Sequence, residues 1–429
     1  MKTLRVGLCG VGNVGGAVLK LLKESSDLLE QQGGFSFELI QVGARKGRSA
    51  IPYDDIDVTT NLMDVANNPD VDIFVELIGG TDFAGELVRT AIKNGKQVVT
   101  ANKALLAVEG DEIFKLAKQN NVQIGFEASV AGGTPVIKAL REGLVANKVE
   151  WFAGILNGTS NYILTEMNVE KTEFSQALLK AQELGLAEAD PAMDIDGTDA
   201  AQKASILAAL AFHVPFNFQA VNYEGIDKVD VEDLRYAEEL GYSIKHIAFG
   251  RLVDQTVFVS AYPTLVPHEV ILSQVGQQMN ALEIYAKGIG STVYYGPGAG
   301  PEPTASAVVA DLVDLAKGGW QVEPTVKTEN ILVSESTMKA PRYFRLMVRN
   351  EPGVIAKISA VFADQNISIE ALIQHETKDK NTGQTEEVPV IILSGSVSNQ
   401  VVDKLLEELN QMEEVANCLK QFRIYTKIK

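Results

Sequence analysis

Residues 188–207, EADPAMDIDGTDAAQKASIL, join an acidic cluster to one lysine and an apolar run. The cluster has five carboxylates in twelve positions: Glu188, Asp190, Asp194, Asp196 and Asp199. Lys203 follows Asp199 by four positions, so a helix would place both side chains on one face. A lysine desolvated among apolar residues and supported by a carboxylate can be tuned for proton transfer. The alternative is an exposed ion pair, which stabilises a helix by about 0.2–0.5 kcal/mol.

Two other interpretations of the acidic cluster concern calcium and helix capping. In the register of an EF-hand loop, Ala192 would stand at the first ligand position and Lys203 at the twelfth, which excludes that site. We expect Thr198 or Asp199 to cap the following helix, because a side-chain oxygen there accepts a free N–H. For Asp190 and Asp196 we favour loop geometry and capping over substrate contact.

A second chemical feature is the glycine-rich stretch GVGNVG. It follows an apolar run typical of a buried strand and precedes a helical pattern, which is the context of a dinucleotide-binding turn. The glycines permit a tight turn and close approach of the backbone to a pyrophosphate, and the helix N-terminus offers free N–H groups. The alternative is a turn used only for packing. The predicted cofactor-binding residues of this loop are Gly10, Val11, Gly12, Asn13, Val14 and Gly15.

Basic residues follow the second predicted strand, in GARKGR. A carboxylate at this point would bind the adenosine ribose of NAD, whereas basic side chains suit a 2′-phosphate. Arg45, Lys46 and Arg48 therefore predict a preference for NADP(H), with NAD(H) possible and Arg45 as the main contact. The alternative is a solvated basic loop.

The composition restricts the partners and metals. A formal net charge of −18 disfavours a nucleic-acid partner. No apolar run approaches the roughly 20 residues of a membrane helix, and glycines interrupt the N-terminal apolar segment, so we expect a cytoplasmic protein with no membrane partner. Two cysteines and four scattered histidines argue against a disulfide framework and a zinc site.

The elements that must position these residues begin with alternating strands and helices. Strands are predicted at residues 4–10, 37–44, 71–80 and 96–103, and residues 113–129 contain a helix and a fifth strand. This alternation predicts an α/β fold, with a Rossmann-type, doubly wound parallel sheet over residues 1–130.

The rest of the chain has a different pattern of predicted helices and strands. Residues 131–299 mix helices, one of them predicted over residues 232–249, with alternating strands, so we expect an α+β catalytic and dimerisation domain. A helix at about 300–318 could return to the first domain, and residues 319–340 are a plausible linker. Residues 341–429 have the order βαββαβ of a ferredoxin-like unit, which we expect to be separate.

Several motifs together resemble the homoserine dehydrogenase family, in its long form with a C-terminal ACT regulatory domain. The resemblance is carried by GVGNVG (10–15), TANKALLA (100–107), FEASVAGGTPVI (126–137), GILNGTSNYILT (154–165), EADPAMDIDGTDAAQK (188–203) and GPGAG (296–300). They occur in order over the first 300 or so residues. The ACT resemblance rests on RNEPGVIAKISAVFADQNISIEAL (349–372).

The resemblance implies reversible oxidation of L-homoserine to L-aspartate 4-semialdehyde, in threonine, methionine and isoleucine biosynthesis. By this analogy Lys203 is the acid/base lysine, and Lys103, near the nicotinamide and the substrate, is a second candidate. Glu188 would bind the substrate ammonium, with Asp199 and Asp194 helping. The family often has a further acid where this chain has Met193. The late glycine-rich loop would bring the chain back to the cofactor at Gly300.

The resemblance also implies two other sites. A structural monovalent cation, expected to be sodium, would be bound by the carboxylate or carbonyl of Glu127 and by the carbonyl oxygens of Val130, Gly132 and Thr134. The alternative is a plain domain-crossing loop. In the C-terminal unit, Asn350 and Gly353 would bind L-threonine as an inhibitor at an ACT–ACT interface of a homodimer or homotetramer. A dimerisation module without a ligand is the alternative there.

Two competing interpretations remain at this point. A Rossmann reductase of another semialdehyde or oxo acid would share the glycine loop but not the block from Glu188 to Lys203. A non-catalytic amino-acid sensor would have no need of both Lys103 and Lys203. The length of the chain leaves no room for a fused aspartokinase before the first strand.

Overall fold

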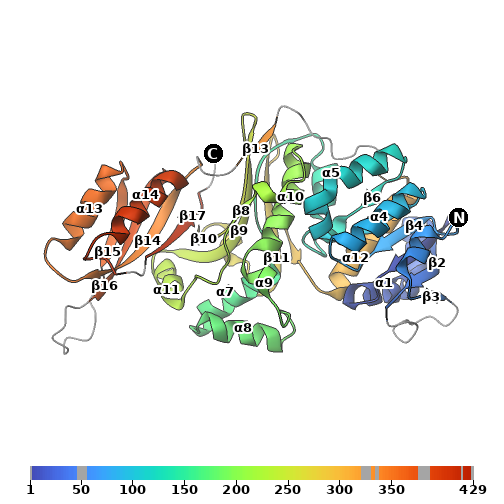
Figure 1. The fold of residues 1–429 in the computed structure, drawn as a ribbon, viewed down its shortest axis with the longest axis horizontal. Helices are drawn as coiled ribbons and strands as arrows, with labels where there is room; N and C mark the ends of the chain where they lie inside the picture. The colour runs from blue at the N-terminus through green and yellow to red at the C-terminus, as the bar shows by residue number, and fades with distance from the viewer. Residues whose placement is uncertain are drawn as a thin grey trace.

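A computed structural model describes residues 2–45, 56–319, 330–333, 338–374, 387–416 and 419–426. The molecule is elongated, with the N-terminal sheet at one end and the C-terminal unit at the other (Figure 1). A mixed sheet with its helices lies between them. Within the described part of the chain, every helix is too short or too polar to cross a bilayer.

The N-terminal domain is a Rossmann-type sheet of six parallel strands in the order β3-β2-β1-β4-β5-β6. Its strands are β1 (Lys2–Cys9), β2 (Phe35–Gly43), β3 (Asp57–Thr59), β4 (Ile73–Glu76), β5 (Gln97–Thr100) and β6 (Ile124–Gly125). The five predicted strands correspond to β1, β2, β4, β5 and β6. The three-residue strand β3 was missed, because so short a run has no detectable period.

Helices cover both faces of this sheet. On one face, α1 and the returning helix α12 share a core with β1 that includes Val6, Val18 and Val308. On the other face, α3, α4 and α5 bury apolar side chains such as Leu87 and Ile113. The helices of this domain are α1 (Asn13–Glu24), α2 (Ser26–Leu28), α3 (Leu62–Asn67), α4 (Asp82–Lys93), α5 (Lys103–Gln119) and α12 (Pro301–Ala316).

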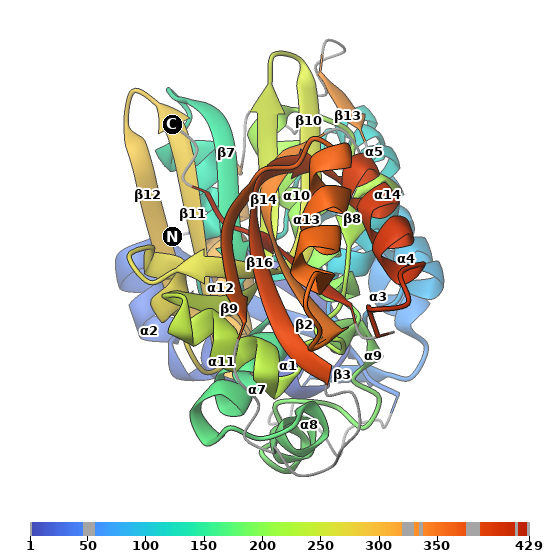
Figure 2. The ribbon, with the colours of Figure 1, turned by 90° about the vertical axis from the view of Figure 1, so that its left-hand side faces the viewer.

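The middle domain is a mixed sheet with helices on one side. The strands β12, β11, β7, β9 and β10 are antiparallel neighbours in that order, and Figure 2 shows several of them edge to edge. They are β7 (Lys148–Ile155), β8 (Asn222–Tyr223), β9 (Tyr242–Val253), β10 (Thr256–Pro267), β11 (Met279–Lys287) and β12 (Gly290–Pro297). The helices are α6 (Val136–Lys138), α7 (Gly158–Glu170), α8 (Phe174–Glu183), α9 (Ala192–Ile195), α10 (Thr198–Phe212) and α11 (Val231–Glu239).

One predicted helix of this domain was wrong in its second half. The helix expected over residues 232–249 ends at Glu239, and β9 begins at Tyr242. Between them Gly241 adopts φ +83°, a left-handed conformation that ends helices. The pairing of β9 along the whole length of β10 then outweighs the local helical pattern.

The C-terminal unit has the ferredoxin-like order expected. It consists of β14 (Lys339–Arg349), α13 (Val354–Asp364), β15 (Ile369–Gln374), β16 (Glu387–Ser398), α14 (Asn399–Asn410) and β17 (Lys420–Ile424). Its strand order is β17-β14-β16-β15. The unit has a hydrophobic core of its own, which includes Phe344 and Leu405. Its strand β17 also pairs with β10, which was not predicted and extends the middle sheet to eleven strands. The short β13 (Ile331–Val333), within the expected linker, pairs with β10 too.

A buried ion pair strengthens this junction. On β14, Arg345 donates through Nε to Asp233 Oδ1 at 2.6 Å, and the Tyr343 hydroxyl donates to the same oxygen at 3.2 Å. Asp233 lies in α11 of the middle domain and is fully buried. Breaking such a buried pair by removing one partner is strongly destabilising, so the two units are held at a defined angle.

Candidate active site

The glycine-rich loop between β1 and α1 has the geometry of a phosphate-binding turn. Gly10 has φ +101°, and a Cβ there would lie 2.5 Å from the Leu77 carbonyl oxygen. A Cβ on Gly15 would lie 1.9 Å from the Gly10 carbonyl oxygen. Gly12 faces open space at the N-terminus of α1, where no side chain caps the helix. The bare backbone and free N–H groups fit a pyrophosphate.

This loop lines a cleft at the carboxyl ends of β1, β2 and β4, where ligands of open α/β sheets bind. Arg45 lies two positions after the end of β2, is exposed and lines the same cleft. Lys46 and Arg48 lie outside the described residues. The remaining lining residues are Gly10, Val11, Gly12, Gly43, Ala44, Leu62, Leu77, Ile78, Gly79 and Phe83.

Three other predicted cofactor residues lie at helix starts. Asn13 and Val14 form the beginning of α1, next to Gly12. Gly300 precedes α12 with φ +112° and does not line the cleft. Its left-handed conformation allows the chain to enter α12, which packs on α1.

Lys203 lies in α10 and its ammonium group is buried. Nζ donates to the Leu156 carbonyl oxygen at 2.7 Å and to Asp199 Oδ2 at 2.8 Å. Only 10% of the lysine side chain is exposed, since α10 is surrounded by apolar side chains over most of its length. The exposed ion pair considered for these two residues is therefore wrong, and the desolvated arrangement is the one that forms.

Lys103 reaches the same carboxylate from the N-terminal domain. Its Nζ lies 3.1 Å from Asp199 Oδ1. It is the first residue of α5, and the preceding Asn102 caps this helix by accepting the Leu105 N–H at 3.1 Å. The helices α5 and α10 share one apolar core, which brings their N-terminal ends together. Attraction to Asp199 raises the pKa of Lys103 and favours its ammonium form.

Asp199 is the centre of this cluster. Burial alone would raise its pKa, but the ammonium groups of Lys203 and Lys103 outweigh burial and hold the pKa well below its usual range. The amide Nδ2 of Asn157 also donates to Asp199 Oδ2 at 2.8 Å. The carboxylate is therefore ionised and binds two cations from two domains.

Asn157 is a site residue that the sequence reasoning missed. It joins β7 to α7, where its Oδ1 accepts the Ser160 N–H at 2.7 Å and caps the helix. Its Nδ2 donates to Asp194 Oδ1 at 2.7 Å as well as to Asp199. An asparagine between a strand and a helix is a capping signature, which could have identified its place but not its acidic partners.

Asp194 and Glu188 extend the acidic surface beyond Asp199. Burial and the charge of Asp199 raise the pKa of Asp194, which is half-buried. Glu188 is exposed, and its carboxylate is close enough to contribute to the raised pKa of Lys103. These two carboxylates leave negative charge at the open side of the cluster, where a ligand ammonium group would be attracted.

The other two acids of the cluster shape the loop. Asp190 Oδ1 accepts the Ala192 N–H at 3.2 Å, and Asp196 Oδ1 accepts the Thr198 N–H at 2.8 Å. Their expected roles in loop geometry are confirmed. The capping expected of Thr198 or Asp199 was wrong, because Gly197 with φ +90° begins the helix and the Asp199 carboxylate turns to the lysines.

Glu127, in the loop between the two domains, forms hydrogen bonds through its carboxylate and through its backbone N–H. Its carboxylate oxygens accept the N–H groups of Ile137 at 2.9 Å and Lys138 at 2.7 Å, and its own N–H donates to Asp311 Oδ2 at 2.8 Å. Burial raises the pKa of Glu127 to about 7. The Glu127 carboxylate is thus occupied by N–H groups of α6. Its backbone carbonyl oxygen is therefore a better ligand for a cation than its carboxylate.

The remaining predicted cation ligands lie in the same loop. Val130 and Thr134 are buried, and Gly132 packs so closely that a Cβ would lie 2.7 Å from the Gly298 carbonyl oxygen. The hydroxyl of Thr134 and the amide of Asn280 are buried without a hydrogen-bond partner among the described residues. Such orphaned oxygens fit a bound water or a hard cation. The described residues contain no cluster of acidic, histidine or cysteine ligands for a metal.

In the C-terminal unit, the loop from β14 to α13 is accessible. Asn350 is exposed, and its Oδ1 accepts from Gln374 Nε2 at 3.2 Å. Gly353 begins α13 with φ +93°, and open space lies where its Cβ would be. Backbone groups of this loop can therefore be approached by a small ligand.

Comparisons with known proteins agree over the whole chain. Family models match residues 10–127 (homoserine dehydrogenase, NAD binding domain), 135–313 (homoserine dehydrogenase) and 342–414 (ACT domain). A homoserine dehydrogenase from Pseudomonas aeruginosa is 40% identical over 434 residues and covers 99% of both chains.

Solved structures give the same result. The crystal structure of a homoserine dehydrogenase from Thiobacillus denitrificans superposes with a TM-score of 0.92 at 41% identity, over 99% of each chain. A hyperthermophilic archaeal homoserine dehydrogenase in complex with NADPH superposes with a TM-score of 0.63 at 27% identity. That match covers 74% of this chain and 98% of the archaeal one.

Proposed function

The chain belongs to the homoserine dehydrogenase family, whose members are NAD(P)-dependent oxidoreductases acting on a CH–OH group, and from this premise we propose its reaction in full. The enzyme oxidises L-homoserine reversibly to L-aspartate 4-semialdehyde, in the biosynthesis of threonine, methionine and isoleucine. The observation that carries the proposal is the contact of Lys103 and Lys203, from two domains, with the single carboxylate of Asp199.

The two lysines supply the proton chemistry of this reaction. When bound, the nicotinamide accepts or supplies the hydride at C4 of the substrate. An ammonium group close to the substrate oxygen gives it a proton during aldehyde reduction and stabilises the negative charge that develops there. Lys203 is held rigidly by Asp199 and the Leu156 carbonyl, whereas Lys103 is more exposed at the domain junction. We assign the acid/base role to Lys203 and charge stabilisation to Lys103.

The acidic surface selects an amino acid as substrate. Glu188 binds the substrate ammonium group, since its carboxylate is exposed next to the lysines. Asp194 adds a second negative charge, and Asp199 orients both lysines. A neutral alcohol would leave this acidic surface uncompensated, which favours substrates that carry an ammonium group.

Nicotinamide absorbance tests the reaction with purified protein, L-homoserine and either coenzyme. We expect homoserine-dependent reduction of the coenzyme in the wild type and its loss in Lys203→Met. The matched control is Lys115→Met, which removes an exposed lysine from α5. Coenzyme binding without turnover in the wild type would reject the proposal.

The coenzyme preference rests on Arg45, which lines the cleft beside the glycine loop. A charged hydrogen bond to a 2′-phosphate contributes about 1.5–3 kcal/mol. We therefore expect Arg45→Ala to lower the NADP-to-NAD ratio of kcat/KM by roughly 10- to 100-fold, at about 1.4 kcal/mol per factor of ten. An unchanged ratio would count against NADP(H) as the preferred coenzyme.

A sodium ion in the loop between the domains would be bound by the carbonyl oxygens of Glu127, Val130, Gly132 and Thr134. Support comes from the orphaned Thr134 hydroxyl in this loop and from oxygen-only ligation. Its role would be structural. Thermal unfolding in sodium and in tetramethylammonium salts at equal ionic strength tests this, and equal midpoints would refute it.

The proposed effector is L-threonine, bound by the loop of Asn350 and Gly353 at an interface between two C-terminal units. Support comes from the accessible loop and from β15, an edge strand of the eleven-stranded sheet that pairs only with β16 among the described residues. Unpaired edges favour pairing with a second copy, so we propose a homodimer or homotetramer. A threonine titration of wild type and Asn350→Ala tests the site, and full activity at saturating threonine would exclude it.

The proposal includes the domain limits and the cellular location. The limits are residues 1–130 with a return helix at about 300–318, 131–299, a linker at 319–340 and 341–429. Cys9 is a buried free thiol, which is in keeping with a cytoplasmic location.

A further inference from the structure

One residue outside the active site contacts both the C-terminal unit and the start of the helix that carries Asp199 and Lys203. Glu224 follows the short strand β8, and its N–H donates to the Ala261 carbonyl oxygen of β10 at 3.0 Å. Its side-chain Oε1 accepts from Arg423 Nη1 of β17 at 3.3 Å. Its carbonyl oxygen accepts from His246 Nε2 of β9 at 2.9 Å.

The backbone of Glu224 lies against Gly197, the N-cap residue of α10. A Cβ on Gly197 would lie 2.8 Å from the Glu224 carbonyl oxygen and 3.3 Å from His246 Nε2. Asp199 follows Gly197 by two positions. The position of this carbonyl oxygen therefore determines where α10 begins, and with it where the carboxylate between the two lysines lies.

The two residues after Glu224 support the preceding turn. The Ile226 N–H donates to the Ile195 carbonyl oxygen at 2.8 Å, and a Cβ on Gly225 would lie 2.2 Å from the same oxygen. Ile195 ends α9, the helix of Asp194. Residues 224–226 thus pack directly against the acidic segment 194–199, and no room remains for a side chain at Gly197 or Gly225.

His246 fixes the position of residues 224–226 through its hydrogen bond to the Glu224 carbonyl oxygen. It is 2% exposed, and burial lowers its pKa, so the imidazole is neutral. Because a carbonyl oxygen only accepts, Nε2 must carry the hydrogen in the bond to Glu224. The carbonyl is thereby hydrogen-bonded to β9, which lies between β7 and β10 in the sheet.

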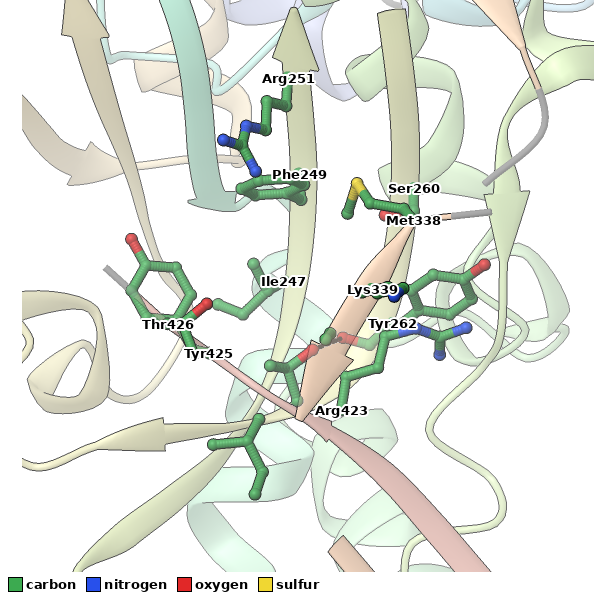
Figure 3. Close-up of a pocket in the computed structure, with 13 residues that line it drawn as sticks. Ile247, Phe249, Arg251, Ser260, Tyr262, Met338, Lys339, Arg423, Tyr425 and Thr426 are labelled. Carbon is green, nitrogen blue, oxygen red and sulfur yellow. Dashed lines mark hydrogen bonds between the residues drawn. The ribbon is translucent and has the colours of Figure 1, made fainter. Parts of the chain in front are cut away.

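Arg423 attaches the side chain of Glu224 to the C-terminal unit. Its guanidinium lies over the Tyr262 ring, 3.2 Å from the ring centroid, in the close-up of the cleft between β10 and β14 (Figure 3). Its Nη2 also donates to Asn399 Oδ1 at 3.5 Å, at the first residue of α14. Arg342 of β14 donates to that same Oδ1. Arg423 is thereby connected to β14 and α14 of the C-terminal unit, while its backbone pairs with Thr264 of β10.

We propose that Glu224 is a positioning residue for the proton-transfer site, and that Arg423 makes its position depend on the C-terminal unit. This inference rests on the proposed reaction. A shift of the C-terminal unit that displaces the Arg423 side chain would pull on the Glu224 carboxylate, and the close approach of the Glu224 backbone to Gly197 would pass a displacement on to Asp199. The Glu224 carboxylate is 40% exposed, so the pair with Arg423 acts through geometry and not through a large contribution to stability.

A double-mutant cycle tests the inference, with Glu224→Ala, Arg423→Met and the double variant. We expect each single variant to lower kcat/KM for L-homoserine about threefold to tenfold, the size typical of residues coupled in one network. The double variant should be no worse than the more severe single variant. Glu224→Gln, which keeps an acceptor for Arg423, should recover most of the activity, and Arg349→Met is the control for an exposed arginine of the same unit.

Hydrogen–deuterium exchange gives a readout independent of turnover. Amides of residues 194–203 should exchange faster in Glu224→Ala and Arg423→Met than in Arg349→Met. Wild-type exchange and wild-type kcat/KM in the two single variants would overturn the inference, as would independent, multiplicative losses in the double variant. A wild type that fails to oxidise homoserine would reject the proposed function instead, and the exchange data would still decide whether Glu224 positions the segment.

Discussion

Replacing Asp199 with Asn tests whether this carboxylate favours the ammonium form of Lys103. The carboxylate oxygens lie 2.8 Å from Lys203 Nζ and 3.1 Å from Lys103 Nζ. Asparagine has nearly the same size and can keep a hydrogen bond to either lysine, but it carries no charge. The variant therefore removes the electrostatic attraction and little else.

The magnitude follows from the geometry. Two unit charges about 4 Å apart attract by about 4 kcal/mol at an effective dielectric constant of about 20. Losing this attraction removes support for the ammonium form, so the pKa of Lys103 falls. The Lys103 side chain is 34% exposed and Asp194 and Glu188 remain nearby, so solvent and residual charge make the effect smaller than the full attraction.

The pH dependence of aldehyde reduction measures this shift. The ammonium form of Lys103 stabilises the negative charge on the substrate oxygen, so the rate falls as the pH rises through the pKa of Lys103. In Asp199→Asn the basic limb of log kcat should move to lower pH, following the fall of that pKa. The control is Asp196→Asn, whose carboxylate accepts only the Thr198 N–H among the bonds described. A lower kcat with an unmoved basic limb would refute the electrostatic reasoning.

Three further predictions concern stability. Burial lowers the pKa of Lys245 to about 8 from 10.5, so the unfolded chain binds more protons between these pH values and the stability rises with pH there. In Lys245→Met, the free energy of unfolding measured in urea should no longer rise over this range. An unchanged rise would contradict this prediction. Burial raises the pKa of Glu127 to about 7 from 4.5, so the stability that this group contributes is present at low pH and is lost as the pH rises through 7. In Glu127→Gln, the free energy of unfolding should no longer fall with pH over this range. Gly197→Ala should cost about 1–2 kcal/mol for its left-handed backbone. It should cost more than Gly185→Ala, which has φ +71° but open space, and equal costs would exclude a clash with Glu224.

Local patterns predicted the N-terminal domain well. The glycine loop, the alternating strands and helices and the ferredoxin-like order of the C-terminal unit depend on neighbouring residues, and each formed as expected. The main error occurred where remote pairing outweighed local preference: the helical pattern after Glu239 became β9 because β10 pairs with it along its length. The pairing of β17 with β10, which joins the C-terminal unit to the middle sheet, was not predicted.

The active site was predicted in part. Asp199 and Lys203 lie one turn apart on one helix, so their contact follows from spacing alone, and the apolar residues of α10 predicted their burial. The contact of Lys103 with Asp199 depends on the packing of α5 against α10. Asn157 belonged to a recognised motif, yet its bonds to two carboxylates required the turn between β7 and α7 to meet α9 and α10.

The amino-acid sequence by itself determined the family, the phosphate-binding turn and the pairing of Asp199 with Lys203, because these depend on residue types and spacing within one or two elements. Only the tertiary structure decided that Lys103 shares the same carboxylate, that the Glu127 carboxylate is used by backbone N–H groups, and that Glu224 lies between Arg423 and Gly197. Such contacts arise when apolar faces of distant segments pack together, and no local period encodes which faces will meet.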